Sequence, residues 1–434
     1  MKHGIQTGTL PKTFQEAIAI ARRLGQRFLW IDSLCIIQDS AQDWQIESAM
    51  MESVYGHSLL NIAATASSSG AGGCFRERNP LLAQLCSVEN VEWDWSTGKH
   101  YLYNSMFWSM GMKYAPLNNR AWIVQERLLA RRVLHFGENQ LYWECNQKDA
   151  CETFPAGLPL RMVEENPRFK SQQPAYGNSR MRCFSEDWFG LLKLDPDLNN
   201  YDLWSNIVLA YTRCDLTMAS DKLVALSGIA NMMRTRMGND EYLAGLWGKW
   251  LPYQLLWYKE KPSGTERSAV YRAPTWSWAS VDGEVWGHPI SLMEGEEILV
   301  TILEAVVQNA GPNTTGSVVS GYIKMRGMLK QARWVYLEED EMHILLFDGR
   351  GPTDVNDSAA YPDCGEVSKE DEVWCLPVHR FEVVEGDWRI YGLVLEKTSS
   401  EKAEYRRIGV FKVDYDDCNV FDNNRLKEEV LIIV

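Results

Sequence analysis

The chain has 434 residues, two to three times the usual domain length, so it can form two or three folded units. Its hydrophobic fraction of 45% and charged fraction of 24% are ordinary for a globular protein and argue against extensive disorder. The net charge is −14 and the basic residues are scattered, which disfavours nucleic acid and anionic lipid as partners. No apolar run resembles a membrane helix or a signal peptide, so we expect a cytoplasmic protein.

The cysteines and histidines do not form a pattern typical of a metal site. The ten cysteines contain no C-x-x-C pair, and the seven histidines contain no H-x-x-x-H spacing. We therefore expect reduced cysteines, no bound metal and no resident cofactor. The unusual feature of the composition is its 18 tryptophans.

The N-terminal pattern predicts a helix followed by a buried strand. Thr13 and Glu16 have the spacing of a capping box at the start of the helix, and Gly25 is typical of its end. Arg27–Asp32 (RFLWID) follows with an apolar run that does not alternate. Such a run is typical of a strand covered on both faces, as in a parallel sheet.

The next segments continue this alternation of helix and strand. They are a helix over Ser40–Tyr55, a strand over Leu59–Ala64, a helix capped by Asn118 or Asn119 and running to about Ala130, and a strand over Arg132–Phe136. Alternating helices and strands are typical of right-handed crossover units in a doubly wound sheet. We therefore predict an α/β domain with a flavodoxin-like parallel sheet over residues 1–150.

The rest of the chain divides by pattern into three further regions. Residues 151–200 are polar and contain prolines, which indicates an irregular connection. Residues 201–290 form a predicted helical region, with helices expected over Tyr201–Arg213, from Ser220 to about Met237, and around Leu243–Tyr258. Short apolar strands separated by turn signals then predict an antiparallel β-rich C-terminal domain over residues 291–434.

Two long blocks of sequence closely resemble the fungal heterokaryon incompatibility (HET) domain. The first runs from TFQEAIAIARRLGQRFLWIDSLCIIQDS to SLLNIAATAS, and the second is PLNNRAWIVQERLLARRVLHFGENQLYWEC. Together they extend over roughly residues 10–145. The resemblance implies a role in self/nonself recognition and programmed cell death.

The chain departs from that family at its beginning. Members usually carry an opening strand with an ALSYxWG-like motif before the first helix, and MKHGIQTG has nothing similar. Either the chain is a truncated or divergent member, or its sequence begins late. In each case we expect the N-terminal domain to lack its usual first strand.

The order of elements also looks like the Toll/interleukin-1 receptor (TIR) domain, which has a flavodoxin-like fold. Some TIR domains cleave NAD with a helix glutamate that follows a tryptophan in a W-x-x-x-E spacing. The matching residues here are Trp122 and Glu126, which are four apart and therefore on one helix face. This analogy of fold implies that NAD is a substrate and that Glu126 is the catalytic residue.

The other candidate site residues surround this pair. Asp32 and Ser33 follow a predicted strand, and ligands of open α/β sheets bind beyond the carboxyl ends of strands. Glu126 would stabilise positive charge on the ribose or orient its hydroxyls, Trp122 would stack on a base, and Arg120 would bind the pyrophosphate. Asp32 would hold a ribose hydroxyl.

Each assignment has a structural alternative. The alternative for Glu126 is an exposed helix glutamate paired with a nearby arginine, for Asp32 a cap of the following turn, and for Arg120 local capping or pairing. For the whole protein, the alternative to an NAD hydrolase is a non-catalytic signalling module that acts by self-association or by binding a protein partner. A carbohydrate-binding β domain, indicated by the WSW segment at 276–278, is a third class.

Overall fold

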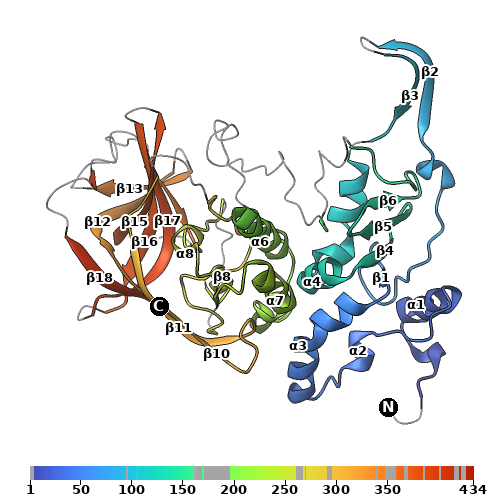
Figure 1. The fold of residues 1–434 in the computed structure, drawn as a ribbon, viewed down its shortest axis with the longest axis horizontal. Helices are drawn as coiled ribbons and strands as arrows, with labels where there is room; N and C mark the ends of the chain where they lie inside the picture. Colours follow the sequence, from blue (N-terminus) through green and yellow to red (C-terminus); the bar gives the residue numbers. More distant parts are fainter. Residues whose placement is uncertain are drawn as a thin grey trace. The chain divides into compact units, whose positions relative to one another are not determined.

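The computed structural model describes the following residues: 4–93, 96–104, 106–160, 162, 169–170, 196–260, 267–268, 270–290, 296–338, 341–347, 358–365, 370–384, 387–399, 402–414, 420–421 and 427–434. The chain divides into two units, Met1–Phe184 and Ser185–Val434, and each is treated by itself (Figure 1). The predicted connection at 151–200 lies mostly outside the described residues.

A four-stranded sheet forms the centre of the N-terminal unit. Its strand order is β1 (Asn61–Ala63), β4 (Arg132–Phe136), β5 (Leu141–Cys145) and β6 (Asp149–Cys151). β1 pairs with β4 in parallel, whereas β4–β5 and β5–β6 are antiparallel. The α/β class and the β4 bounds are confirmed, but the expectation of a wholly parallel sheet is wrong, because two short connections join β4, β5 and β6 as a meander.

Helices cover both faces of this sheet. On one face, Ile20 of α1 (Lys12–Arg23) packs with Phe136 and with the partly buried Ile62 and Leu134. On the other face, Ala63 and Val133 pack with Tyr55 of α3 (Ala41–His57). Alternate residues of β1 and β4 thus point to opposite helical layers, as strand geometry requires.

The first helix ends as predicted but begins differently. Gly25 has a φ of 70°, and the amides of Gly25 and Gln26 donate to the carbonyls of Arg22 and Ala21, which is a Schellman motif. Thr13, however, donates its hydroxyl to the Gly70 carbonyl, and Glu16 accepts from the amides of Cys74 and Phe75. The two side chains of the expected capping box therefore bind a distant loop, which sequence spacing does not specify.

The predicted strand at Arg27–Asp32 is not part of the sheet. Residues 26–31 have no strand pairing, and Asp32–Cys35 form the short helix α2. Phe28 is 86% exposed. Ile31 has extended backbone dihedrals, but a strand also needs a partner to pair with, and the described residues place none beside this segment.

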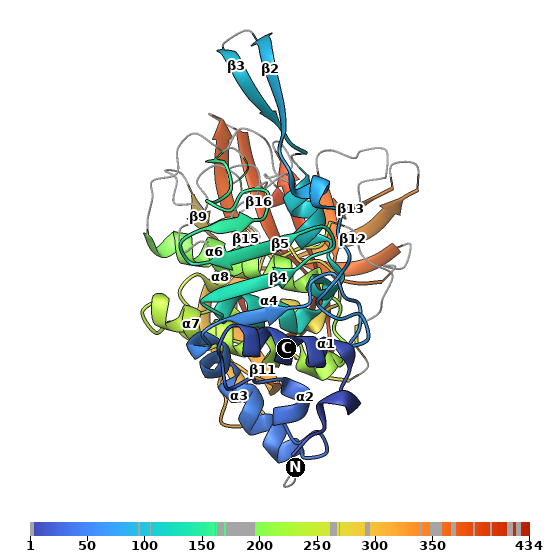
Figure 2. The ribbon, with the colours of Figure 1, turned by 90° about the vertical axis from the view of Figure 1, so that its right-hand side faces the viewer.

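One residue separates the helix α4 (Ala121–Leu129) from a preceding 3-10 turn. Neither Asn118 nor Asn119 caps this helix; both lie in a 3-10 turn, Pro116–Asn119, and Arg120 occupies the N-cap position. The hairpin of β2 (Cys86–Trp93) and β3 (Ser96–Leu102) projects from its own unit in both ribbon views (Figures 1 and 2).

The C-terminal unit begins with a helical region. It contains α6 (Pro196–Thr212), α7 (Ser227–Arg236), the two-stranded pair β7 (Tyr242–Leu243) and β8 (Leu246–Trp247), and the short helix α8 (Leu251–Gln254). The expected long helix around 243–258 is wrong, because Ala244 and Gly245 both have positive φ and turn the chain back between β7 and β8.

The predicted antiparallel β-rich region forms a ten-stranded sheet. It contains β9 (Glu297–Ile298), β10 (Thr301–Asn309), β11 (Val318–Met328), β12 (Lys330–Leu337), β13 (Met342–Phe347), β14 (Ser358–Pro362), β15 (Glu370–Val384), β16 (Asp387–Lys397), β17 (Glu404–Asp414) and β18 (Glu428–Ile433). Because β16 pairs with both β15 and β17, the strands β12, β13, β14, β17, β16 and β15 close into a barrel.

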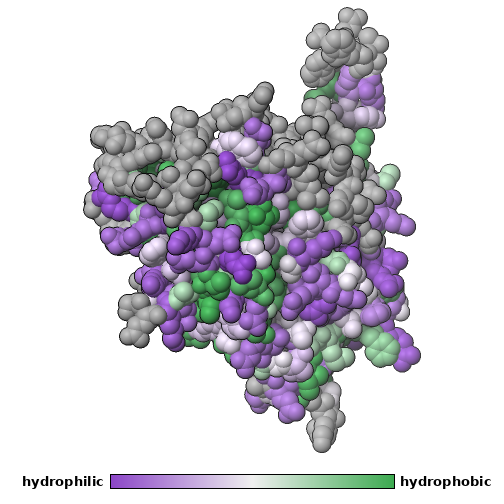
Figure 3. All heavy atoms as spheres, turned by 60° about the vertical axis from the view of Figure 1, so that its left-hand side comes forward, coloured by the Kyte–Doolittle hydropathy of each residue, from purple (hydrophilic) through white to green (hydrophobic). Residues whose placement is uncertain are grey.

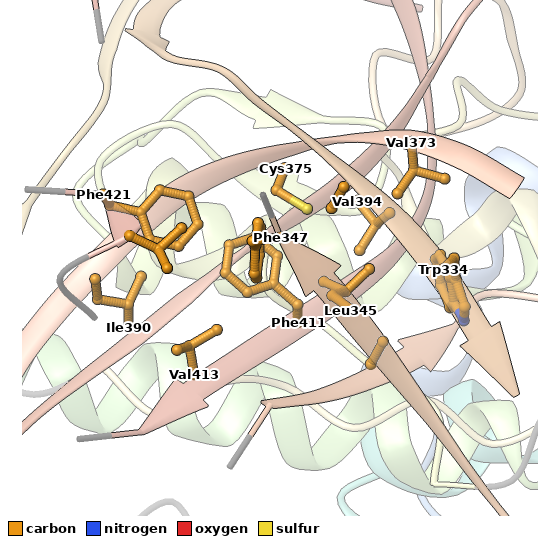
Figure 4. Packing of buried hydrophobic residues seen from close by; sticks show 13 residues of the cluster. Trp334, Leu345, Phe347, Val373, Cys375, Ile390, Val394, Phe411, Val413 and Phe421 are labelled. Carbon is orange, nitrogen blue, oxygen red and sulfur yellow. The ribbon is translucent and has the colours of Figure 1, made fainter. Parts of the chain in front are cut away.

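Large apolar side chains fill this barrel. Trp334, Phe347, Phe411 and Val394 converge in its interior, and Trp334 and Phe411 are fully buried (Figure 4). Hydrophilic side chains cover much of the described surface visible in Figure 3. None of the helices in the described ranges has the length and apolar character that crossing a membrane requires.

Candidate functional site

A cleft of about 880 Å³ lies beside β1 in the N-terminal unit. Residues of α1, α3 and α4 line it, together with residues 61–64 and 28–32. β1 is the end strand of its sheet among the described residues, so the cleft follows an unpaired strand edge. The volume is near the upper end of the range of about 300–1,000 Å³ that is usual for small-molecule sites.

Glu126 supplies a carboxylate to this cleft. It lies in the middle of α4, one turn after Trp122, and its side chain is partly buried. The Tyr55 hydroxyl, from the last turn of α3, donates a hydrogen bond to the Glu126 carboxylate. Asp32 and Arg120 line the same cleft, close enough for their charges to act on Glu126. The cleft thus brings Asp32 of α2 together with two residues from the N-cap and body of α4, Arg120 and Glu126.

The electrostatic surroundings change how Glu126 and Tyr55 titrate. Burial raises the pKa of Glu126 to about 7 and the Asp32 carboxylate adds to this, while the Tyr55 hydrogen bond and Arg120 act in the opposite direction. Burial and the neighbouring Glu126 raise the pKa of Tyr55 above its ordinary value. Tyr55 therefore stays a hydrogen-bond donor at neutral pH, and Glu126 changes charge near neutral pH.

Asp32 and Ser33 occupy the first turn of α2. Asp32 is exposed, lines the cleft, and accepts a hydrogen bond from the Ser33 amide at 2.7 Å. This is a contact with the next residue, and the N-cap position of α2 belongs to Ile31, so neither the capping role nor the ribose-binding role of Asp32 is decided by it. Ser33 is exposed and is not among the residues that line the cleft.

Trp122 lies apart from the cleft lining. Its indole packs edge-to-face against Trp44 of α3, with ring centroids 6.4 Å apart. The indoles that do line the cleft belong to Trp30 and Trp143, and Trp30 also packs edge-to-face against Tyr55 at 5.7 Å. An aromatic wall is therefore present, but it comes from residues that sequence spacing did not select.

A buried ion-pair network, which the sequence prediction missed, holds α4 on the sheet. Arg127 donates from Nε and Nη2 to the two oxygens of Glu144, at 2.6 and 2.5 Å. His135 Nε2 lies 3.0 Å from the same carboxylate, and His135 Nδ1 lies 2.9 Å from Thr65 Oγ1. Lys170 donates to the carbonyls of Arg127 and Ala130 at the end of α4. Because Arg127 follows Glu126 directly, this network fixes the helix that carries Glu126.

The charged groups of this network shift one another's pKa values. Burial alone would raise the pKa of Glu144, but the Arg127 guanidinium and the His135 hydrogen bond hold it well below its ordinary value. Burial lowers the pKa of His135, against the opposing effect of Glu144. Glu144 is thus ionised and His135 neutral near pH 7. A glutamate inside the apolar strand LYWEC is the one sequence signal that would have indicated such a network.

The family comparison finds a match in the N-terminal part of the chain, which contains most of the cleft residues. Residues 1–126 match the family model described as heterokaryon incompatibility protein (HET). No curated protein and no solved structure matches the chain. Within the described residues, no group of three or more His, Cys, Asp or Glu side chains is arranged to hold a metal ion. The matched segment contains Asp32, Tyr55, Arg120 and Glu126, so these four residues lie in the part of the chain that is similar to the heterokaryon incompatibility (HET) family.

Proposed function

We propose that the chain acts in fungal heterokaryon incompatibility by hydrolysing NAD to nicotinamide and ADP-ribose in the cleft beside β1. The observation that carries this proposal is the position of Glu126, a partly buried carboxylate hydrogen-bonded to Tyr55 and next to Asp32 and Arg120. The weaker resemblance to TIR domains supports it, since their catalytic glutamate follows a tryptophan with the spacing of Trp122 and Glu126. Loss of NAD would then cause the cell death that follows incompatibility.

The chemistry needs one ionised carboxylate. The bond between ribose C1′ and the nicotinamide nitrogen breaks, its electron pair stays on nitrogen, and nicotinamide leaves as a neutral base from a cationic ring. The oxygen of a water molecule then bonds to C1′ and releases a proton. The transition state has oxocarbenium character, so the negative charge of Glu126 stabilises it, and no second carboxyl is needed as an acid.

The other residues bind and orient the substrate in this proposal. Arg120, at the exposed mouth of the cleft, pairs with the pyrophosphate, and Asp32 accepts from a ribose hydroxyl. Tyr55 fixes the Glu126 carboxylate. The stacking role predicted for Trp122 stays a prediction, and Trp30 is a second candidate because its ring lines the cleft.

The test is to incubate the purified full chain with NAD and measure nicotinamide by chromatography. We expect release by the wild type and loss of at least about 100-fold in Glu126→Gln, which keeps the size of the side chain and its acceptor for Tyr55. Glu138→Gln is the matched control, because Glu138 is an exposed glutamate in a surface ion pair with Arg76. Equal turnover by Glu126→Gln and the wild type would overturn the proposal.

A second candidate function is signalling by self-association, and the apolar rim of the same cleft favours it. Phe28, Leu59 and Leu24 line the cleft and are 86%, 57% and 47% exposed. Exposed apolar residues beside an unpaired strand edge are typical of surfaces that bind another chain. In sedimentation velocity, this candidate predicts dimers that dissociate in Phe28→Asp. A wild-type chain that stays monomeric at tens of micromolar would exclude it.

A further inference from the structure

A group of buried cationic side chains lies in the C-terminal unit, outside the cleft and outside the barrel core. Lys222, Lys259, Arg272 and Arg407 are at most 8% exposed. Arg267 joins them through Asp363, whose carboxylate pairs with both Arg267 and Arg407. Asp282 pairs with both Lys222 and Arg272.

The two halves of the group differ in how well their charges are satisfied. Arg407 donates to the carbonyls of Leu255 and Trp257 as well as to Asp363. Arg267 donates to Ser280 Oγ at 2.6 Å and to the Arg407 carbonyl at 2.6 Å. Arg407, Arg267 and Asp363 thus form a closed network with little capacity for a ligand.

The guanidinium of Arg272, in contrast, lacks hydrogen-bond acceptors among the described residues for most of its N–H groups. Its Nη1 lies 2.9 Å from Asp282 Oδ1, and its side chain is 4% exposed. Its Nε and Nη2 atoms are buried and have no hydrogen-bond partner. Buried guanidinium donors are almost always paired in folded proteins, and an unpaired one indicates a missing water or ion.

Lys222 adds a second charge at the same carboxylate. Its Nζ lies 3.6 Å from Asp282 Oδ1, and its side chain is 6% exposed. Burial, and to a lesser extent Arg272, lower the pKa of Lys222 to about 8, against the opposing effect of Asp282, so it is mostly charged at neutral pH. One carboxylate, itself 49% exposed, is therefore shared by two buried cations.

We propose that the Nε–Nη2 edge of Arg272, together with Lys222 Nζ, binds a small oxyanion of the phosphate type. This edge presents two parallel N–H donors, the geometry that binds phosphate oxygens in a bidentate way. Water would satisfy the donors, but an anion also offsets the second positive charge of the Arg272 and Lys222 pair, which shares the single carboxylate of Asp282. Asp282 pairs with Nη1 of Arg272 and is half-exposed, so solvent reaches the group at the Asp282 carboxylate.

The test is thermal unfolding of the full chain in sodium phosphate, with sodium chloride adjusted to keep the ionic strength constant. We expect Tm to rise with phosphate and with sulfate, because a ligand that binds the folded state stabilises it in proportion to ln(1 + [L]/Kd). Equilibrium dialysis with radiolabelled phosphate gives the stoichiometry, expected to be one per chain. If chloride raises Tm as much as phosphate, or no phosphate is retained, the proposal fails.

Substitutions of single residues test whether the oxyanion binds at Arg272 and Lys222. Arg272→Met removes the buried charge and is expected to lose the phosphate-specific rise in Tm, whereas its Tm without phosphate is expected to be equal or higher. Arg213→Met is the matched control, because Arg213 is a more exposed arginine paired with Glu284 in the same unit. If Arg272→Met does not fold, Lys222→Met is used instead. Retention of the phosphate-specific rise by the folded variant would overturn the assignment.

A further comparison identifies the source of the oxyanion. Adenosine monophosphate carries the same phosphoryl group on a larger molecule. A rise in Tm equal to that with phosphate supports a site for the phosphoryl group of a nucleotide or similar ester. A rise with phosphate alone supports a site for the free anion.

Discussion

The two units differ in whether their sheet closes: the C-terminal sheet forms a barrel, whereas the described N-terminal sheet stays open. In the C-terminal unit, β15, β16 and β17 pair so that six strands form a barrel around Trp334 and Phe411. In the described part of the N-terminal unit, β1 pairs on one edge with β4 and has no strand partner on the other, and residues of β1 line the cleft. Closure satisfies backbone groups and buries apolar side chains, whereas an open edge leaves space for polar side chains to meet a ligand. We therefore expect the barrel to contribute most to the stability of the chain, and the cleft to be where the proposed substrate binds.

The largest effect is expected in the barrel. Trp334→Ala removes a fully buried indole and leaves a cavity, so it should cost about 3–5 kcal/mol and lower the calorimetric Tm of the C-terminal unit. Trp30→Ala, in the wall of the open cleft, is the comparison variant and should cost less, because Trp30 is only partly buried. Equal losses from the two changes would contradict the division between the units.

The next effect is expected at the ion-pair network under α4. Glu144→Ala leaves the Arg127 guanidinium without its carboxylate partner, so it should cost about 3 kcal/mol in the free energy of unfolding of the N-terminal unit. The control is Glu138→Ala, which removes an exposed ion pair with Arg76 and should cost at most about 0.5 kcal/mol. A small effect of Glu144→Ala would show that the network does not fix α4.

A smaller effect, with a definite pH dependence, is expected at Glu126. Its pKa is raised to about 7 in the folded state from an ordinary value of 4.5, so the folded state binds more protons between these values and stability falls as pH rises through this window. Glu126→Gln removes this loss. It should therefore raise the free energy of unfolding by about 1–2 kcal/mol at pH 8 and by almost nothing at pH 4. The gain at pH 8 is smaller than the pKa shift alone would give, because solvent in the open cleft screens the charge.

Denaturant unfolding at the two pH values measures this difference. Asp32→Asn is a useful companion variant, because it removes the nearby negative charge that raises the pKa of Glu126 and should reproduce a smaller part of the gain. A Glu126→Gln variant with the same stability relative to wild type at both pH values would contradict the raised pKa.

The smallest effect is expected at Phe28. Its ring is 86% exposed, so Phe28→Ser should change the free energy of unfolding by less than about 0.5 kcal/mol. If residues 27–32 were instead a strand covered on both faces, the same change would cost several kcal/mol. Chemical denaturation of this variant therefore tests the open-edge description directly.

Helices and strands whose limits depend on nearby residues are predicted well from the sequence. The helix predicted over Ser40–Tyr55 is α3 (Ala41–His57), and β4 has the predicted bounds, because helical periodicity and a short apolar run act over a few residues. The segment at 27–32 was predicted incorrectly as a strand, since pairing depends on a partner far away in the sequence. The barrel closure between β16 and β17 likewise follows from contacts that no local pattern specifies.

The candidate site was predictable in part for the same reason. The family resemblance and the W-x-x-x-E spacing selected Glu126, and Arg120 and Asp32 lie in the same cleft. Tyr55 was missed because a tyrosine in the last turn of a helix has no distinctive sequence signal. Trp122 shares a helix with Glu126, but its indole contacts Trp44, a tertiary contact that helical spacing does not reveal.

The most direct test of the central claim is the pH profile of nicotinamide release by the full chain in saturating NAD. The ionised form of Glu126 is the one that stabilises an oxocarbenium ion, so the rate should rise with pH and reach half its maximum near pH 7. Tyr55→Phe should move this midpoint to higher pH, because the Tyr55 hydrogen bond lowers the pKa of Glu126. A wild-type chain that releases no nicotinamide at any pH, or a Glu126→Gln variant with an unchanged profile, would contradict the account.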